Sequence, residues 1–379
     1  MSYKRYELGK ICHISAGGDR PEVCSDIKTE KTPVPIFSNG MENDGLYGYT
    51  DKAKVEGDVV TVSARGVNVG TVCYRNEPFT PIVRLLSLIP NRQIVDAKYL
   101  YYVLRNTVLS GTGSAQPQIT APMIKKQEIL LLEDVKEQQK IAFFLSLIDD
   151  KIILNRQIND NLHQQAKAIF EHMFQENAST SPATIADIAL NVTDGVHNTV
   201  KDDPEGQYLL LSCKNIKGGS LSIGSSERKI NSETFEKLRR RTKLEKGDIL
   251  ISSVGTVGEL LLLNTEPLNY EFQRSVAIVK PNPEFVSSAY VYESLVAQKA
   301  ELINAAHGAV QQCLFISDIA GFPIGIPSTD TLRSFDETVK PMFDTISANE
   351  AENSRLEALR DTLLPKLMSG EIDVSDIDL

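Results

Sequence analysis

The side chains best suited to chemistry in this chain are hydrogen-bonding and charged groups in its polar segments. Arginine and lysine bind phosphates and guanine edges, asparagine and glutamine bind adenine edges, and serine and threonine bind phosphates. We expect each candidate to lie in a loop or turn, within reach of a nucleic acid; the alternative for each is contact with water alone. The candidates are Ser15, Arg20, Asn39 and Arg65 in the first part of the chain, and Thr193, His197, Lys201, Lys214 and Arg228 in the second.

Motifs of common catalytic sites are missing from the sequence. It has no Asn/Asp-Pro-Pro-aromatic tetrapeptide of an amino-methyltransferase and no G-x-x-x-x-G-K-[ST] phosphate loop. The glycine-rich stretches 66–70 and 255–258 lack the following helix of a dinucleotide site, so we expect hairpin turns. The five histidines and five cysteines show no metal-ligand spacing. The sequence therefore predicts no catalytic residue, no metal site and no cofactor in this chain.

Three further features have alternative interpretations. Arg84 and Arg274 stand 190 residues apart in stretches with strand character, so we expect them to be structural. His197 lies in a polar loop and could reach a nucleic acid or be a structural loop histidine. A basic cluster occupies 228–243 and is either a solvated helix face or a binding surface. Its members are Arg228, Lys229, Lys237, Arg239, Arg240, Arg241 and Lys243.

Two long helical stretches must position these segments. Ten positions recur 194 residues apart, with alternating steps of four and three, which is the spacing of a coiled-coil seam. Both copies interrupt the apolar seam at its centre with Asn-x-x-x-Asn. The first copy is Ile141, Leu145, Ile148, Ile152, Asn155, Asn159, Leu162, Ala166, Ile169 and Met173; the second is Phe335, Val339, Met342, Ile346, Asn349, Asn353, Leu356, Arg360, Leu363 and Leu367.

Each stretch predicts a helix of about 40 residues, hence about 60 Å long. An amphipathic helix of this length needs a partner for its apolar stripe, and the nearest candidate is its own copy. Antiparallel pairing would bring Asn155 and Asn159 opposite Asn349 and Asn353. Buried asparagines at these positions fix the register of a coiled coil. The alternative is a crossing point where the helices diverge and water enters.

The remaining sequence repeats as well. Leu8 and Ile11 match Ile185 and Ile188 at an offset of 177, and later landmarks match at 190 to 194, so the second copy holds about 13 extra residues. Local signals predict a strand pair near 59–62 and 70–74, a helix over 97–109 and a linker over 176–182. Pro341 is expected to kink the second long helix or delay its start.

Together these patterns predict an α+β chain. It should have two domains of mixed short strands and helices, separated by two long helices that form an antiparallel coiled coil with pseudo-twofold symmetry. The predicted divisions are 1–133, 134–176, 177–327, 328–370 and an acidic tail, 371–379. A rigid spacer between two related, divergent domains suits a two-part target such as duplex DNA.

Composition limits the class of protein. The chain has 379 residues, 41% hydrophobic and 24% charged, with a net charge of -10. No stretch approaches the run of about 20 apolar residues that spans a membrane, and the N-terminus lacks an apolar signal core. The scattered cysteines fit a reducing cytoplasm. A net negative charge does not exclude nucleic-acid binding, because binding depends on a local patch.

Several motifs, in their order and duplication, resemble those of type I restriction-modification specificity (S) subunits. The first copy carries 113–119 (GSAQPQI) with Pro122, and 137–141 (EQQKI) before the long helix. The second carries 193–197 (TDGVH), 247–250 (GDIL) with Gly255 and Gly258, and 359–370. It departs from the pattern at 308–313, where GAVQQC replaces the Gln-Pro-Gln of the first copy.

The resemblance implies that 1–133 and 177–327 are target-recognition domains, each reading one part of a bipartite asymmetric site in double-stranded DNA. It implies that the helices 134–176 and 328–370 are a spacer that docks methyltransferase (M) subunits, with a restriction/translocase (R) subunit joining them. The chain itself would be non-catalytic. The alternative is a coiled-coil scaffold presenting two protein-binding domains without nucleic acid, which the acidic balance favours. A stand-alone modification enzyme is disfavoured by the missing motifs.

Overall fold

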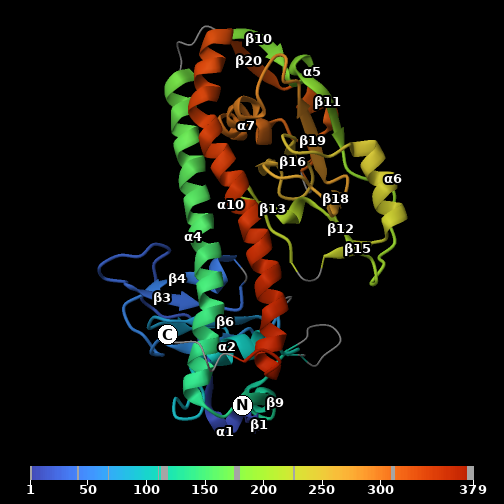
Figure 1. Ribbon diagram of the computed structural model, residues 1–379. Coiled ribbons are helices and arrows are strands. Elements are labelled where there is room, and N and C mark those ends of the chain that lie inside the picture. Colours follow the sequence, from blue (N-terminus) through green and yellow to red (C-terminus); the bar gives the residue numbers. More distant parts are fainter. Residues whose placement is uncertain are drawn as a thin grey trace. The chain divides into compact units, whose positions relative to one another are not determined.

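The computed structural model describes residues 2–40, 42–66, 68–109, 111, 118–174, 180–224, 227–308 and 312–373. The chain separates into two compact units, and Figure 1 labels many of their helices and strands. Unit 1 is Met1–Lys151 with Arg355–Leu379, and unit 2 is Ile152–Ser354. Because this division falls inside the long helices, the predicted domain limits stay predictions.

Unit 1 begins with a strand and a single helical turn and then forms a small α+β body. Its elements before the long helix are β1 (Tyr3–Glu7), α1 (Leu8–Ile11), β2 (Cys12–Ala16), β3 (Val34–Phe37), the 3-10 turn η1 (Glu42–Gly45), β4 (Leu46–Thr50), β5 (Val59–Val62), β6 (Val72–Arg75), β7 (Thr80–Pro81), β8 (Leu86–Pro90), α2 (Ala97–Arg105), α3 (Ala121–Lys125) and β9 (Glu128–Leu132).

Unit 2 repeats this order with additions. Its elements between the long helices are β10 (Thr180–Thr184), α5 (Ile185–Ile188), β11 (Ala189–Asp194), β12 (Tyr208–Leu211), η2 (Cys213–Asn215), β13 (Ile216–Lys217), β14 (Ser220–Leu221), β15 (Arg228–Ile230), α6 (Ser232–Thr242), β16 (Ile249–Ser252), β17 (Leu260–Leu262), β18 (Tyr270–Phe272), β19 (Val276–Pro281), α7 (Ser288–Ala297), α8 (Lys299–Asn304), α9 (Ile316–Ala320) and β20 (Pro323–Pro327).

The sheets of the two units have matching strand orders. The four-stranded sheet is β2-β8-β5-β6 in unit 1 and β11-β19-β16-β17 in unit 2. The three-stranded sheet β4-β3-β7 corresponds to β15-β12-β18, and each has one antiparallel and one parallel pairing. The pair β1-β9 corresponds to β10-β20. Among the described residues, unit 2 has η2 and the hairpin β13-β14 between β12 and β15, where unit 1 has η1 between β3 and β4. Helix α6 lies between β15 and β16, where unit 1 joins β4 to β5 without a helix or strand.

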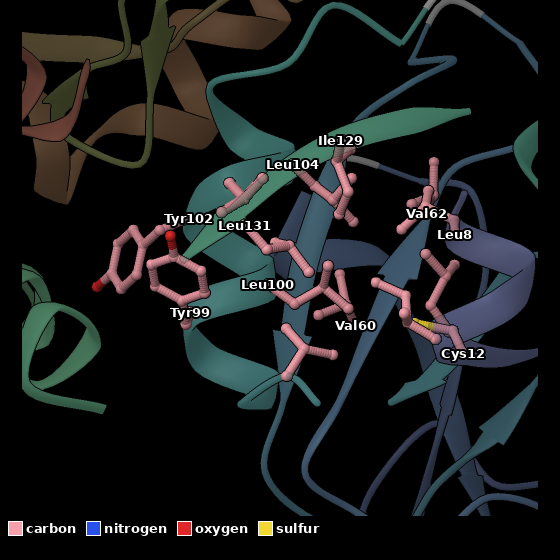
Figure 2. Close-up of a cluster of buried hydrophobic side chains, with 14 of the residues drawn as sticks. Leu8, Cys12, Val60, Val62, Tyr99, Leu100, Tyr102, Leu104, Ile129 and Leu131 are labelled. Atoms are coloured by element: carbon pink, nitrogen blue, oxygen red, sulfur yellow. The ribbon is translucent and has the colours of Figure 1, made fainter. Parts of the chain in front are cut away.

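The core of unit 1 lies between the four-stranded sheet and the helices that cover it (Figure 2). Val60 and Val62 are two residues apart in β5, so both side chains lie on the sheet face that meets this core. They meet Leu100 of α2 and Leu8 of α1, all at most 1% exposed. Helix α2 begins at Asp96, whose carboxylate accepts a bond from the amide of Tyr99 at 2.9 Å.

The long helices are α4 (Val135–Phe174) and α10 (Thr329–Ser369), and they pack together as the repeat predicts. In unit 1, Leu145 of α4 shares a core with Leu364 and Leu367 near the end of α10. In unit 2, Phe170 near the end of α4 shares a core with Phe335 near the start of α10. The early part of each helix therefore meets the late part of the other, which confirms the antiparallel coiled coil.

The asparagines at the centre of the seam pair across the two helices within unit 2. The Asn155 amide donates to Asn353 at 2.9 Å and to Glu352 at 2.8 Å, and the Asn349 amide donates to Asn159 at 2.8 Å. Asn155, Asn159 and Asn353 are buried. Their predicted role in fixing register stays a prediction.

Two local predictions are wrong, and one of two alternatives for a third is excluded. Helix α2 ends at Arg105, four residues short of the predicted Leu109. Residues 180–182 belong to β10 rather than to a linker, because Thr180 to Thr184 pair with Pro327 to Pro323 in β20. Helix α10 starts at Thr329, so Pro341 does not delay it, and the kink that was the alternative stays a prediction. In the second case a tertiary pairing overrides a polar, turn-like composition.

Candidate nucleic-acid interface

One end of the four-stranded sheet in unit 1 gathers loops that carry predicted site residues. Strand β2 ends at Ala16 opposite Leu86, where β8 begins, and Val62 at the end of β5 also pairs with Leu86. We call the loops that leave this end the rim of unit 1. They are residues 17–20, 63–66 with 68–70, and 82–85.

Unit 2 has the same rim at the matching end of its sheet. Asp194 at the end of β11 and Ile251 of β16 both pair with Ala277 of β19. The loops leaving this end are 195–198, 253–258 and 273–276, which we call the rim of unit 2. The two rims are built alike: the Gly17 amide donates to Leu85 at 2.8 Å, and the Gly195 amide donates to Val276 at 3.1 Å.

Close backbone contact explains the glycine at the start of each rim. A Cβ atom on Gly17 would lie 2.7 Å from the carbonyl carbon of Pro81. A Cβ atom on Gly195 would lie 2.1 Å from the carbonyl oxygen of Phe272. Because no other residue fits without moving the backbone, glycine lets the first rim loop lie against the turn that precedes β8 or β19.

Ser15 and Thr193 occupy corresponding positions, each one residue before the end of the first sheet strand. Ser15 lies in β2 and Thr193 in β11, and both are half-buried. Arg228 lies in β15 and Lys214 in η2. The expectation that every candidate lies in a loop or turn is therefore wrong for Ser15, Thr193 and Arg228. The hydroxyls of Ser15 and Thr193 still stand directly beside the rims.

Asn39 ties two rim loops of unit 1 together. Its amide nitrogen donates to the Val83 carbonyl at 2.6 Å, and its amide oxygen accepts from the Ala64 amide at 2.8 Å. Its own carbonyl accepts from Asn68 at 3.2 Å. Both ends of the Asn39 side chain thus stabilise the rim, while its contact with a nucleic acid stays a prediction.

The arginines of the unit 1 rim are exposed. Arg20 lies over the ring of Tyr47 at 5.4 Å, which leaves its charge on the surface beside an aromatic face. Arg65 lies in the 63–70 loop, where its backbone bridges Gln118. Residues 113–117 of the predicted GSAQPQI motif lie outside the described residues, but Gln118 directly follows them. The motif therefore joins the rim at Arg65.

In unit 2 the carboxylate of Asp194 binds a histidine and an arginine at the rim. Asp194 is 9% exposed; it lies 2.6 Å from Nε2 of His197 and 2.9 Å from the Arg241 guanidinium. Arg241 also donates to the Gly195 carbonyl at 2.7 Å. The sequence signal for Arg241 was its basic cluster, but the candidate set omitted it because Asp194 lies 47 residues away in sequence.

The other members of the basic cluster have different positions. Arg239 is bonded to the fully buried Glu271 and stabilises the interior. Lys214 pairs with Glu227 at 3.0 Å; burial would raise the pKa of Glu227, but Lys214 and Asn215 lower it overall. Arg228 is exposed, and its guanidinium donates to the Val200 carbonyl at 3.4 Å, next to the exposed Lys201. Lys201 and Arg228 thus form a second basic patch.

The structure corrects the interpretation of Arg84 and Arg274. Both are exposed residues of turns, rather than members of strands. Their match is also shifted by one position. The Arg274 amide donates to Val196 at 3.0 Å as the Val83 amide donates to Gly18 at 2.9 Å, so Arg274 corresponds to Val83. Both turns lie on the rims.

The described residues offer neither a metal site nor a helix that could span a membrane. No group of three or more His, Cys, Asp or Glu side chains in these ranges is arranged to hold a metal ion. No helix in the part of the chain that the structure describes is long and apolar enough to cross a membrane.

Comparison with known proteins identifies the family. The family model "Type I restriction modification DNA specificity domain" matches residues 2–164. A Mycoplasma pneumoniae protein, described as the N-terminus of a putative type I specificity subunit, is 30% identical over 153 residues, covering 38% of this chain and 77% of that protein. The chain belongs to the type I restriction-modification specificity subunits. Its DNA specificity domain therefore includes the whole rim of unit 1.

Longer matches agree with this family. The type I restriction enzyme MjaIX specificity subunit of Methanocaldococcus jannaschii is 26% identical over 344 residues, covering 82% of this chain and 76% of that protein. The crystal structure of an S subunit from M. genitalium has a TM-score of 0.57 at 17% identity, covering 97% of this chain and 96% of that chain. This likeness shows that the specificity subunit has the same fold.

Proposed function

We propose that this specificity subunit reads a bipartite, asymmetric site in double-stranded DNA, with one half-site at each rim. The observation that carries the proposal is the repetition of one sheet rim with different side chains. Arg20 and Arg65 lie on the first rim, whereas His197 lies on the second, where Arg241 of α6 contacts the Gly195 carbonyl. Two similar frames with different donors suit two half-sites of different sequence.

Ser15 and Thr193 support the same mode of binding to the DNA backbone at both rims. Hydroxyls beside a polar edge suit phosphate contacts, which fix the position of a protein on the duplex without reading its sequence. Lys201, Lys214 and Arg228 would extend the unit 2 surface along the phosphate backbone. Asn39 would keep the first rim in shape.

The proposal includes docking of methyltransferase subunits on α4. This helix exposes large apolar side chains at positions outside its seam, between 36% and 50% exposed. They recur at helical spacing: Phe143, Phe144 and Leu147 in the unit 1 part, and Ile153, Leu154 and Ile158 in the unit 2 part. Exposed apolar patches of this kind mark protein interfaces.

Helix α10 lacks this stripe. At the positions 194 residues later, its residues are Glu337, Thr338, Pro341, Ser347, Ala348 and Glu352. Docking of the methyltransferase subunit is therefore expected on α4 rather than on α10, although both helices have the same seam pattern. In this account the partners supply methylation and the restriction/translocase subunit joins the complex. The specificity subunit itself is non-catalytic, works without a cofactor and is cytoplasmic.

The DNA-recognition proposal is tested by binding of the assembled complex with its methyltransferase partner. We expect preference for one bipartite sequence over scrambled duplexes, and an affinity that falls steeply with salt as counterions are released. Equal binding of all duplexes, with little effect of salt, would instead support the coiled-coil scaffold without nucleic acid.

The docking proposal has a matched control in the repeat. Leu154→Glu places a charge in the α4 stripe and should abolish co-purification of the methyltransferase subunit. Ala348→Glu, at the corresponding position of α10, should leave co-purification intact. Equal loss in both variants, or in neither, would reject the α4 face as the docking surface.

A further inference from the structure

The turn that precedes β8 in unit 1 has a counterpart before β19 in unit 2. In unit 1 the Leu85 amide donates to Ile82 at 3.0 Å, and in unit 2 the Val276 amide donates to Gln273 at 3.0 Å. Backbone bridges join Gly18 to Ile82 and Val196 to Gln273. The four-residue turns 82–85 and 273–276 therefore occupy the same place on the two rims.

Each turn has one arginine at its tip. Arg84 is the third residue of its turn and Arg274 the second of its own, and both are exposed. Among the described residues, neither guanidinium has an ion-pair or hydrogen-bond partner. Arg241, by contrast, is held by Asp194. The positive charges of Arg84 and Arg274 are therefore not paired with a described side chain, which suits binding of a negatively charged ligand.

The two turns present their exposed arginines on different backbone conformations. Val83 has a φ of 51° and Arg84 a φ of 62°, in the left-handed region that β-branched and bulky residues rarely adopt. Neither Arg274 nor Ser275 has a positive φ among the described residues. Such strain costs on the order of 1–3 kcal/mol per residue and clusters at functional sites. The arginine is present in both turns despite this change in backbone.

Other rim positions differ between the units. Gly18-Asp19-Arg20 corresponds to Val196-His197-Asn198, and Arg65 corresponds to Val254. Half-sites of different sequence present different bases. A side chain that both rims share is therefore suited to a part of the DNA that does not change with sequence. The group that both half-sites share is the phosphate backbone.

Resting on the proposed function, we propose that Arg84 and Arg274 are matched phosphate anchors that hold each rim on DNA without reading its sequence. Base selection then falls to the rim residues that differ, such as Arg65 and His197. Because a phosphate accepts a point charge, lysine should replace either anchor, whereas a bidentate contact to guanine needs the planar guanidinium.

The test uses the complex of the full chain with its methyltransferase partner. Arg84→Ala, Arg274→Ala, Arg84→Lys and Arg274→Lys are measured against the preferred duplex and a panel of single-base variants, at several salt concentrations. Each alanine variant should bind every duplex on the order of tenfold more weakly, and lower the slope of log affinity against log salt by about 1. Each lysine variant should keep most of the affinity and the slope.

Arg5→Ala, on β1, and Arg333→Ala, on α10, are controls for loss of one exposed arginine off the rims, and should change neither quantity. A shifted base preference at one position in Arg84→Ala or Arg274→Ala, or a lysine variant as weak as alanine, would show base reading and overturn the inference. Unchanged affinity and salt slope in the alanine variants would also overturn it. Failure of the proposed function is distinguishable, because the wild-type complex itself would then show no sequence preference.

Discussion

At the scale of single residues, Glu293 on α7 is a buried carboxyl that controls stability through pH. It is 1% exposed, and burial raises its pKa to about 8; Lys167 opposes this rise and Glu171 adds to it. The folded chain therefore holds a proton that the unfolded chain releases near its ordinary pKa of 4.5. Stability contributed by this proton is present below pH 4.5 and is lost as pH rises to about 8.

Glu293→Gln should remove this loss of stability between pH 4.5 and pH 8. Near pH 4.5 the variant and the wild type should have similar free energies of unfolding, and at pH 8 the variant should be more stable by on the order of 2–3 kcal/mol. Urea unfolding at several pH values measures the difference. Glu301→Gln, an exposed position on α8, is the control. Parallel pH curves for Glu293→Gln and wild type would contradict the account.

Rim residues show where sequence alone reached its limit. Ser15, Asn39, Arg65, Thr193 and His197 could be chosen by residue type, and the fold places all of them at or beside a rim. The turns of Arg84 and Arg274 were missed, because nothing in Val83-Arg84 indicates positive φ and only pairing of β8 defines the turn. Arg241 was missed because its partner Asp194 is distant in sequence.

At the scale of elements, the helix pair in unit 1 contains an ion pair at a seam position, between the buried Arg360 and the half-buried Asp149. Arg360, which is 8% exposed, donates to Asp149 at 2.8 Å, and Asp149 also accepts from the Tyr102 hydroxyl at 2.7 Å. The first copy of the seam has Ala166 at the position of Arg360. Because of this difference between the two copies, the charged contact forms in unit 1 and has no equivalent at the matching seam position in unit 2.

Each partner keeps other contacts, Asp149 with Tyr102 and Arg105 and Arg360 with Asp361. Loss of the charged hydrogen bond between them in Arg360→Met or Asp149→Asn should therefore destabilise the chain by about 1–3 kcal/mol. The double variant should lose less than the sum, with a coupling energy of about 1–3 kcal/mol. The exposed pair Lys340 and Asp344 on α10 is the control, with coupling of about 0.5 kcal/mol or less. Additive losses at 149 and 360 would show that the pair is not coupled.

The asparagines at the centre of the seam give a second prediction. Replacing both partners, Asn155→Leu with Asn353→Leu, should stabilise the helix pair, because no orphaned amide remains, but should loosen its register. A cysteine pair at Leu162 and Ile346 reports the native register, and one at Leu162 and Val339 reports a shift of one heptad. Raised stability with only native cross-links would leave the register role without support.

Regular elements were the most predictable part of this chain. The period of the seam predicted both long helices and their antiparallel pairing, because ten matched positions outweigh any local exception. Short strands were less predictable, as β10 and the end of α2 show, since their limits depend on partners such as β20 rather than on local composition.

At the scale of the whole molecule, the proposed function makes the helix pair a ruler between two half-sites. One heptad inserted at matched positions of α4 and α10 adds about 10 Å to each helix. The gap between half-sites should grow by about three base pairs, at 3.4 Å each, while both half-sites keep their sequence. A heptad of alanine and glutamate inserted in the acidic tail, 371–379, is the control. An unchanged gap would show that the helices do not set spacing.

In the proposed function, this chain alone chooses a bipartite, asymmetric DNA site for its partners. The most direct measurement is a map of methylated bases in a genome that expresses the chain with its methyltransferase. We expect methylation at one sequence made of two different half-sites with a fixed gap, and none when the chain is omitted. Methylation that persists without the chain, or that follows an uninterrupted or palindromic sequence, would contradict the account.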